Sequence, residues 1–429
     1  MKILKTDEAF FEENYSGFLK RASEGDAQAA ATAQGVIADI RAQGDAALFD
    51  YTERFDGHRP EALEVTKAEI DAAMKSIEPK ALQALKTAAA RIRKFHLQQK
   101  KKIAASWTTQ NEGVFVGEQI RPLARVGIYV PGGLAAYPST VLMNAVPAKV
   151  AGVKEIIMVS PWRDGKPNPH TLAAAKLAGV TKIFKIGGAQ AVAALAYGTK
   201  TIPAVDKIVG PGNAYVAAAK RLVFGKVGID MIAGPTEIAV VADDGAAPES
   251  VAADLLSQAE HDPMAVSVLF THSEKLIEAV QSALDRQLSG LERRSILKKA
   301  IEGSGLIVKT KNVNESIDLS NRFAPEHLSV QVKNARKTLP KIRHAGAIFL
   351  GPLSPVAFGD YLAGPNHVLP TSGTARFSSP LGVGDFLKRS SVIEVGPKAF
   401  EKLGPVVVRL AELEGLTAHA ASVSVRKKI

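Results

Sequence analysis

Cysteine is absent from all 429 residues of the chain. Its absence excludes disulfides, zinc sites and iron–sulfur clusters held by thiolates, and any mechanism that uses a thiol nucleophile. A chain without cysteine also fits a reducing compartment, although it does not require one. We therefore expect any metal that this chain binds to be held by nitrogen and oxygen donors.

Long apolar segments are also missing. Apolar runs such as the one at 191–197 are far too short to span a bilayer. An apolar signal-peptide segment would not tolerate the acidic residues among the first twenty, which are Asp7, Glu8, Glu12 and Glu13. We therefore expect a cytoplasmic protein with no membrane partner, long enough for two or three domains.

Basic residues outnumber acidic ones by 54 to 43, which gives a formal net charge of +11. The densest basic cluster comprises Arg91, Arg93, Lys94 and the lysines at 100–102. A nucleic-acid partner is one explanation for such a cluster, but no aromatic ladder or known binding module accompanies it. We favour a solvated helix face and expect no nucleic-acid partner. The charge can still attract an anionic cofactor or substrate.

The spacing of apolar residues divides the chain into four parts. Residues 1–125 are mostly helical and end in β-branched residues at strand spacing. Strands alternate with helices over 126–235 and again over 236–380, and helical spacing returns over 381–429. We predict an α/β protein with two Rossmann-like parallel-sheet domains and a C-terminal helical arm, and we expect the N-terminal part to pack with the second domain.

Three glycine-rich segments follow strands of the first α/β domain and precede helices: YVPGG at 129–133, GGAQ at 187–190 and GPGN at 210–213. Ligands of open parallel sheets bind beyond the carboxyl ends of the strands, where helix N-termini can hold a phosphate. None of the three segments is the GxGxxG fingerprint, and any one of them alone is better explained as structural. Together they make a binding rim plausible.

Side chains that could bind a metal occur in the second domain and the arm. Gln258 and His261 lie three residues apart on a predicted helix, hence on one face, and Asp360 and His419 could add an oxygen and a nitrogen. Nitrogen and oxygen donors without sulfur suit zinc. Spacing alone cannot join positions so far apart, and a histidine at a helix end is usually a cap or surface group. From the residues alone the set is a candidate only.

Glu326 and His327 are adjacent titratable residues that follow a proline. Histidine titrates near neutral pH and is the usual general base, and a neighbouring carboxylate can handle a second proton. An ordinary exposed Glu–His pair in a loop explains the segment at least equally well.

Together these segments resemble the histidinol dehydrogenase family. The resemblance runs nearly from end to end, and several of the matching segments are long and stand in the order found in the family. They are RVGIYVPGG, IGGAQAVAALAYGT, VGPGNAYV, AGPTE, DLLSQAEHDP, NRFAPEHL, GDYLAGPNHVLPT and EGLTAHAAS.

The resemblance implies a zinc-dependent enzyme that oxidises L-histidinol to L-histidine through L-histidinaldehyde, with two NAD and one water, as the last step of histidine biosynthesis. It implies one Zn²⁺ per subunit and Glu326 and His327 as the acid–base pair. From their residue types, we expect Glu326 to activate water and His327 to act as the general base. The other implied site residues are the zinc ligands Gln258, His261, Asp360 and His419, the NAD contacts Tyr129, Gln190 and Asn213, and the substrate contacts Thr236, Gln258, His261, His327, Asp360, Glu414 and His419.

Two further residues of these segments have open roles. Thr236 stands where many members of the family have serine; it keeps the hydroxyl and adds a methyl group, which tightens the packing. His367, in GPNH at 364–367, either supports other site residues or contacts the substrate.

The resemblance also implies a homodimer in which the C-terminal arm over 381–429 closes the neighbour's site, so that Glu414 and His419 act across the interface. Two other classes remain open on the residues alone. A zinc hydrolase would use the same ligands and a glutamate base but would not need the glycine-rich rim, and a non-catalytic α/β binding protein would tolerate the loss of Glu326 and His327.

Overall fold

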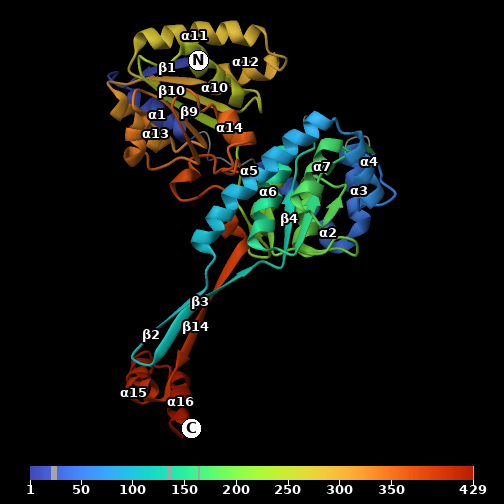
Figure 1. Cartoon of the computed structure of the whole chain (residues 1–429), viewed down its shortest axis with the longest axis vertical. Coiled ribbons are helices and arrows are strands. Elements are labelled where there is room, and N and C mark those ends of the chain that lie inside the picture. The colour runs from blue at the N-terminus through green and yellow to red at the C-terminus, as the bar shows by residue number, and fades with distance from the viewer. Residues whose placement is uncertain (21–26, 133–136, 163–164, 429) are drawn as a thin grey trace.

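Two separate parallel sheets and a third, antiparallel sheet organise the chain (Figure 1). The computed structural model describes residues 1–20, 27–132, 137–162 and 165–428. Gly133, the last residue of YVPGG, lies outside the described residues. The predicted fold class, two parallel-sheet α/β domains with N-terminal helices and a C-terminal helical arm, is confirmed.

The first domain is built on a five-stranded parallel sheet in the order β6-β5-β4-β7-β8. Its strands are β4 (Arg125–Tyr129), β5 (Glu155–Val159), β6 (Lys182–Phe184), β7 (Lys207–Val209) and β8 (Gly228–Ile229). The helices that connect them are α6 (Pro138–Ala151), α7 (Pro169–Ala178), α8 (Gly188–Tyr197) and α9 (Ala214–Val223).

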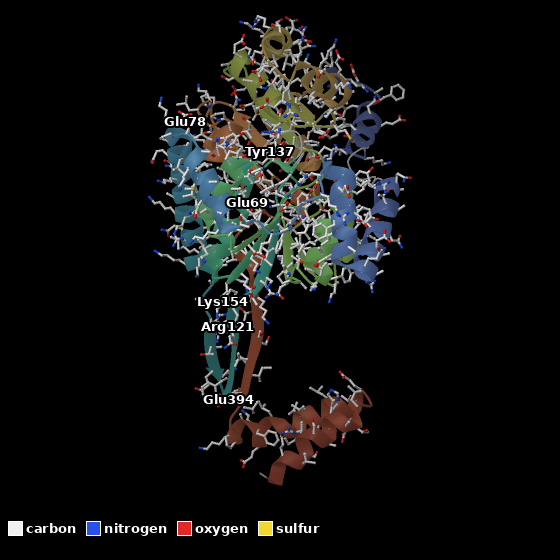
Figure 2. The ribbon with its side chains drawn as sticks, turned by 90° about the vertical axis from the view of Figure 1, so that its right-hand side faces the viewer. Glu69, Glu78, Arg121, Tyr137, Lys154 and Glu394 are labelled. Atoms are coloured by element: carbon white, nitrogen blue, oxygen red, sulfur yellow. The ribbon has the colours of Figure 1, made fainter. Side chains whose placement is uncertain are left out.

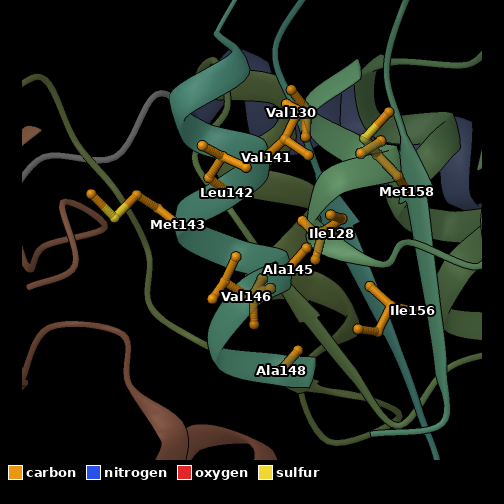
Figure 3. Close-up of a cluster of buried hydrophobic side chains, with 14 of the residues drawn as sticks. Ile128, Val130, Val141, Leu142, Met143, Ala145, Val146, Ala148, Ile156 and Met158 are labelled. Atoms are coloured by element: carbon orange, nitrogen blue, oxygen red, sulfur yellow. The ribbon is translucent and has the colours of Figure 1, made fainter. Parts of the chain in front are cut away.

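Both faces of this sheet are buried, as expected for a parallel sheet covered by crossover helices. Ile156 and Met158 of β5 point to the face covered by α6 and α7 (Figure 3), whereas Ile157 and Val159 point to the face covered by α8 and α9. The strand is therefore apolar without alternation, because each side chain meets a helix.

The N-terminal helices form an outer layer on both faces of the first domain. They are α2 (Ala27–Gln43), α3 (Asp45–Asp56), α4 (Lys67–Ser76) and α5 (Pro79–Ile103). The helices α4 and α5 pack on α6 and α7, and α2 and α3 pack on α8 and α9. This corrects the expectation that residues 1–125 pack with the second domain. Only β1 (Lys2–Lys5) and α1 (Phe11–Lys20) lie there, because β1 pairs with a strand of the second sheet.

The second domain contains a six-stranded parallel sheet in the order β1-β11-β10-β9-β12-β13. Its other strands are β9 (Glu237–Ala242), β10 (Val266–Thr271), β11 (Leu306–Lys309), β12 (His327–Gln331) and β13 (Ala347–Leu350). Helices α10 (Pro248–Ala259), α11 (Glu274–Ser289) and α12 (Arg294–Ser304) cover one face, and α1 and α13 (Val313–Phe323) cover the other. Shorter elements follow at η2 (Ala335–Lys341), α14 (Val356–Tyr361), η3 (Thr374–Arg376) and η4 (Val383–Phe386).

The arm extends away from both parallel sheets (Figures 1 and 2). It consists of β2 (Trp107–Asn111), β3 (Val114–Pro122) and β14 (Leu387–Val395), followed by α15 (Pro397–Leu413), α16 (Thr417–Ser424) and η5 (Val425–Lys428). The helical spacing predicted α15, but not the strand β14, which pairs with β3 along nine residues. Within the described ranges, no helix is both long and apolar enough to cross a membrane.

Tyr15 fixes α1 to the second domain. Its side chain is fully buried, its hydroxyl donates to the carbonyl oxygen of Leu319 on α13 at 2.8 Å, and its ring packs edge-on against Phe270 of β10. We expect Tyr15→Ala to destabilise the protein by about 3–5 kcal/mol, because it opens a large cavity. Tyr15→Phe should cost only about 1 kcal/mol, the worth of one hydrogen bond.

Urea unfolding followed by circular dichroism measures this difference. Phe10→Ala is the matched control, because that nearby aromatic side chain is 70% exposed and its loss should change stability by less than about 0.5 kcal/mol. Equal unfolding midpoints for Tyr15→Ala and Phe10→Ala would contradict the placement of α1.

Candidate active site

A cavity of about 1100 Å³ lies between the two domains and is lined by residues of both. The first domain borders it with the carboxyl ends of its strands, as the glycine-rich segments predicted. The second domain borders it with the amino ends of β9 and β12 and with the end of α10. Ten predicted residues line it: Tyr129, Gln190, Asn213, Thr236, Gln258, His261, Glu326, His327, Asp360 and His367.

Glu414 and His419 are not among the described residues that line the cavity. Glu414 follows α15 and His419 lies on α16, and both side chains are exposed on the arm. The fold therefore separates these two predicted site residues from the cavity of their own chain (Figure 1).

Tyr129 ends β4 and holds the glycine-rich rim together. Its hydroxyl accepts a hydrogen bond from the backbone N–H of Gly188 at 3.0 Å, and burial raises the pKa of that hydroxyl to about 12, so it stays neutral. Gly210 packs so closely that a Cβ there would lie 2.2 Å from the carbonyl oxygen of Tyr129, and its φ of +110° also favours glycine. Glycine in GPGN therefore allows two strand ends to touch.

Gln190 and Asn213 occupy the N-terminal turns of α8 and α9. Asn213 caps α9 by accepting from the backbone N–H of Val216 at 3.1 Å, which is a structural role. Gln190 is 1% exposed, and neither polar atom of its side-chain amide has a hydrogen-bond partner in the described parts of the chain. A buried amide without partners beside a cavity is available to a ligand.

A buried ion pair between Lys220 and Asp230 holds the GPGN loop in place. The ammonium of Lys220 on α9 pairs with the carboxylate of Asp230, and both side chains are almost fully buried. Lys220 also donates to the carbonyl oxygen of Gly210 at 2.9 Å, and Asp230 accepts from the N–H of Gly210 at 2.7 Å. Both backbone polar groups of Gly210 are thus held by the pair.

His327 begins β12 with a defined orientation. Its Nδ1 lies 3.0 Å from the carbonyl oxygen of Glu237, which can only accept, so Nδ1 carries a proton. Its Nε2 is turned toward Asp360, 3.4 Å from Oδ1. Oε2 of Glu326 lies 3.5 Å from Nδ1 and accepts from the N–H of Glu237 at 2.9 Å and from the hydroxyl of Thr236 at 2.6 Å. The predicted pair is therefore buried and positioned, unlike an exposed pair in a loop.

The carboxylates of Glu326 and Asp360 determine the pKa of His327. Burial lowers its pKa, but the negative charge of Glu326 and the hydrogen bond to Asp360 outweigh burial and raise the pKa to about 10. Burial likewise raises the pKa of Asp360, but the hydrogen bond from His327 and the nearby His367 and His261 lower it below its usual range. Without a bound ligand or a partner subunit, the ring of His327 is therefore a protonated imidazolium between the carboxylates of Glu326 and Asp360.

Three of the four predicted metal ligands meet at the cavity. Gln258 lies on α10, His261 lies two residues beyond its end, and Asp360 lies on α14. Oε1 of Gln258 lies 2.8 Å from the hydroxyl oxygen of Thr236. That hydroxyl has only one proton to donate, and the carboxylate of Glu326 also accepts it. With its amide group turned, Gln258 would donate to Thr236 instead and present its oxygen to a metal.

The chemistry of the three donors Gln258, His261 and Asp360 fits a zinc ion. An amide oxygen, an imidazole and a carboxylate suit zinc, and the C-terminal end of α10 favours a cation. However, the residues that the structure describes contain no group of three or more His, Cys, Asp or Glu side chains that could hold a metal ion. Gln258, His261 and Asp360 would thus supply three donors from one chain, of which two are His or Asp.

His367 supports Asp360. Its Nδ1 lies 2.9 Å from the backbone carbonyl oxygen of Asp360, so it fixes the end of α14, and its ring also borders the cavity. Burial lowers the pKa of His367, which favours the neutral ring. Both open roles for His367, support and substrate contact, agree with this position.

Glu237 is a part of the site that the sequence analysis missed. Its backbone carbonyl and N–H position His327 and Glu326, and its own carboxylate accepts from the N–H of Ser372 at 3.0 Å. Burial, reinforced by the charge of Glu326, raises the pKa of Glu237 to about 8. Its only sequence signal is its place in AGPTE, directly after Thr236.

Comparisons with known proteins agree with the resemblance. A family model described as histidinol dehydrogenase matches residues 19–427. The chain is 51% identical to the histidinol dehydrogenase of Geobacter metallireducens, covering 100% of this chain and 98% of that protein. It is 52% identical to the one of Syntrophotalea carbinolica, covering 100% and 99%. The crystal structure of histidinol dehydrogenase from Elizabethkingia anophelis superposes with a TM-score of 0.93 at 38% identity, covering 100% of this chain and 98% of that one.

Proposed function

Because the chain belongs to the histidinol dehydrogenase family, we propose that it oxidises L-histidinol to L-histidine through the aldehyde, using two molecules of NAD and a bound zinc ion. The observation that carries the proposal is the two-sided cavity. Helix N-termini and the unpaired amide of Gln190 border one side and favour an anionic dinucleotide. A helix C-terminus and the donors Gln258, His261 and Asp360 border the other and favour a cation.

Gln258, His261 and Asp360 would hold the zinc ion, and His419 of a second copy would complete four ligands. When bound, the ion would anchor the amino and imidazole nitrogens of the substrate. Asp360 would then share its negative charge with a cation and would stabilise the imidazolium of His327 less. The pKa of His327 would fall from about 10 towards neutrality, where it can act as a base.

The chain's own residues account for the proton transfers. His327 would accept the proton of the alcohol through Nε2 while a hydride leaves the same carbon for the first NAD, giving the aldehyde. Glu326 would then remove a proton from water as the water oxygen attacks the aldehyde, while the protonated His327 returns its proton to the carbonyl oxygen, giving a hydrate and a neutral His327. His327 would take a proton of that hydrate during the second hydride transfer, giving the carboxylic acid.

Thr236 and the NAD contacts serve orientation in this scheme. The Thr236 hydroxyl joins Glu326 to Gln258, so the residue that activates water and a metal ligand are positioned together. Its methyl group is accommodated without disturbing these contacts. Tyr129, Gln190 and Asn213 would contact the dinucleotide from the rim of the first domain.

A homodimer with shared sites explains the arm. Apolar side chains of α15 are exposed at helical spacing, with Val406 at 55%, Leu410 at 57% and Leu413 at 68%. Such a face is unfavourable in water and fits another protein surface. Because Glu414 and His419 lie near this face and far from their own cavity, we propose that they complete the site of the neighbouring subunit.

Absorbance of NADH tests the activity. We expect purified protein with L-histidinol, NAD and zinc to form two NADH per histidinol, with activity lost on chelation and restored by zinc. A reaction without L-histidinol is the control. Absence of NADH with metal present would overturn the proposal, and hydrolysis of a test ester or amide without NADH would favour a zinc hydrolase.

Substitutions divide the roles of the acid–base pair. His327→Asn should reduce both oxidations by about 10²–10⁴-fold, the usual contribution of a general base. Glu326→Gln should reduce the oxidation of added L-histidinaldehyde by a similar factor and the alcohol step much less. Rates with each substrate measured separately give the comparison, with Glu302→Gln on the exposed surface of α12 as the control. Equal losses of both steps in Glu326→Gln would contradict this division.

Mixed dimers test the shared sites. Neither His419→Ala nor His327→Asn should be active alone, but a heterodimer has one intact site if the arm serves the neighbour. A statistical mixture should then recover about a quarter of the wild-type activity, since half of the dimers each carry one of two sites. Co-expression with two different tags isolates the heterodimer. An isolated heterodimer without activity would show that the arm does not serve the neighbouring cavity.

A further inference from the structure

A buried carboxylate of the second domain takes no part in the proposed proton transfers. Asp254 on α10 is 6% exposed, and its Oδ2 accepts from the hydroxyl of Ser329 at 3.0 Å and from the side-chain amide of Gln331 at 2.8 Å. Both donors belong to β12, the strand that begins with His327. Asp254 therefore joins α10 to the strand that carries the proposed base.

Helix α10 and strand β12 face each other with polar side chains. His327, Ser329 and Gln331 alternate along β12, so they point to one face of the sheet, and the residues between them point to the other. On α10, Asp254 and Gln258 are four residues apart, which places them on one side of the helix. The contact at Asp254 and the metal ligand proposed at Gln258 thus belong to the same side of α10.

The dimensions of helix and strand extend this contact to the active site. From Asp254 to Gln258 the helix rises about 6 Å, and from Ser329 back to His327 the strand covers about 6.6 Å. Because α10 connects the parallel strands β9 and β10, it runs against the direction of the sheet, which includes β12. With Asp254 opposite Ser329, the next turn of α10 lies beside the start of β12. That turn carries Gln258, the strand starts with His327, and both side chains line the cavity.

A carboxylate is costly in these surroundings. The core on this face of the sheet is mostly apolar, and Val251 and Leu255 of the same helix are fully buried. Burial raises the pKa of Asp254, and the hydrogen bonds from Ser329 and Gln331 offset only part of that rise. Apolar side chains of similar shape in place of all three would be about as stable. Stability alone therefore does not explain the carboxylate.

We propose that Asp254 is a positioning residue, which fixes the register of α10 on β12 and so holds Gln258 in place relative to His327. His261 follows the end of α10 and is positioned with it. The proposal rests on the proposed function, in which these residues hold the ion and supply the base. Asp254 acts only through them, because it is not among the described residues that line the cavity.

Zinc affinity and turnover test the role of Asp254. Asp254→Ala removes both hydrogen bonds to β12, and we expect it to weaken zinc binding about tenfold, as is usual when a residue that orients metal ligands is lost. At saturating zinc, kcat with L-histidinol should also fall about tenfold, whereas KM for NAD should not change, because the rim of the first domain is untouched. Competition with a chromogenic chelator measures the affinity, and absorbance of NADH measures the turnover.

Two matched variants separate positioning from stability. Asp254→Asn keeps the shape and an oxygen that can accept both hydrogen bonds, so zinc affinity and kcat should stay within about threefold of wild type. Val280→Ala deletes buried methyl groups from α11 on the same face of the sheet. It should lower the unfolding midpoint, as Asp254→Ala does, but leave zinc affinity unchanged.

Two results would overturn the role of Asp254. One is a folded Asp254→Ala variant with zinc affinity and kcat within twofold of wild type, and the other is an Asp254→Asn variant as defective as Asp254→Ala. If Asp254→Ala does not fold, Ser329→Ala replaces it, because that change removes only one of the two hydrogen bonds. It should weaken zinc binding about threefold, and unchanged affinity would equally overturn the proposal.

This proposal and the proposed function fail in different ways. Wild-type protein that binds zinc but forms no NADH from L-histidinol would overturn the proposed function. The role of Asp254 is still judged in that case, because zinc affinity relative to wild type needs no turnover. Wild-type protein that binds no zinc would overturn both.

Discussion

One short connection between the two domains, residues 230–237, holds the cofactor side and the acid–base side of the cavity in place together. At its start Asp230 pairs with Lys220 and fixes both backbone polar groups of Gly210. At its end Thr236 and Glu237 hold Glu326 and His327. In the proposed reaction, the segment would therefore position the hydride acceptor and the proton acceptor together. Displacing either end of the segment from its own domain would break buried, charge-assisted bonds, which are costly to lose.

The two domains present opposite ends of their parallel sheets to the cavity, and this determines the electrostatics. The first domain contributes strand carboxyl ends with the N-termini of α8 and α9, where the helix dipole is positive. The second contributes strand amino ends with the C-terminus of α10, where it is negative. One cavity can thus favour an anionic dinucleotide and a cation side by side. The net charge of +11 is not needed for this, because the local dipoles and the unpaired amide of Gln190 act at the site itself.

Sequence reasoning succeeded where local patterns decide the structure. Buried strands such as β5, and helices such as α15, follow from the periodicity of their apolar residues. Sequence reasoning failed where contacts between residues far apart in the sequence determine the structure. The docking of α2 to α5 on the first domain depends on matching surfaces, and β14 is a strand because it pairs with β3, some 270 residues earlier. The site shows the same division. Motifs located ten cavity residues, but Asp39, Tyr51 and Phe55 belong to no motif and reach the cavity only through the packing of α2 and α3.

Several buried polar atoms around the cavity remain without partners in the described structure, and this is best understood as a cost that ligands relieve. The side-chain amide of Gln190 has no hydrogen-bond partner, and Nε2 of His327 has only the longer contact with Asp360. Leaving a buried polar group unsatisfied costs about 1–3 kcal/mol. A fold that needed only stability would place apolar side chains at both positions. Because the chain has no cysteine that could trap an aldehyde, the second oxidation of the proposed reaction would have to use water and a base. In the proposed reaction, Nε2 of His327 would be the atom that accepts the transferred protons, once a bound cation weakens its contact with Asp360.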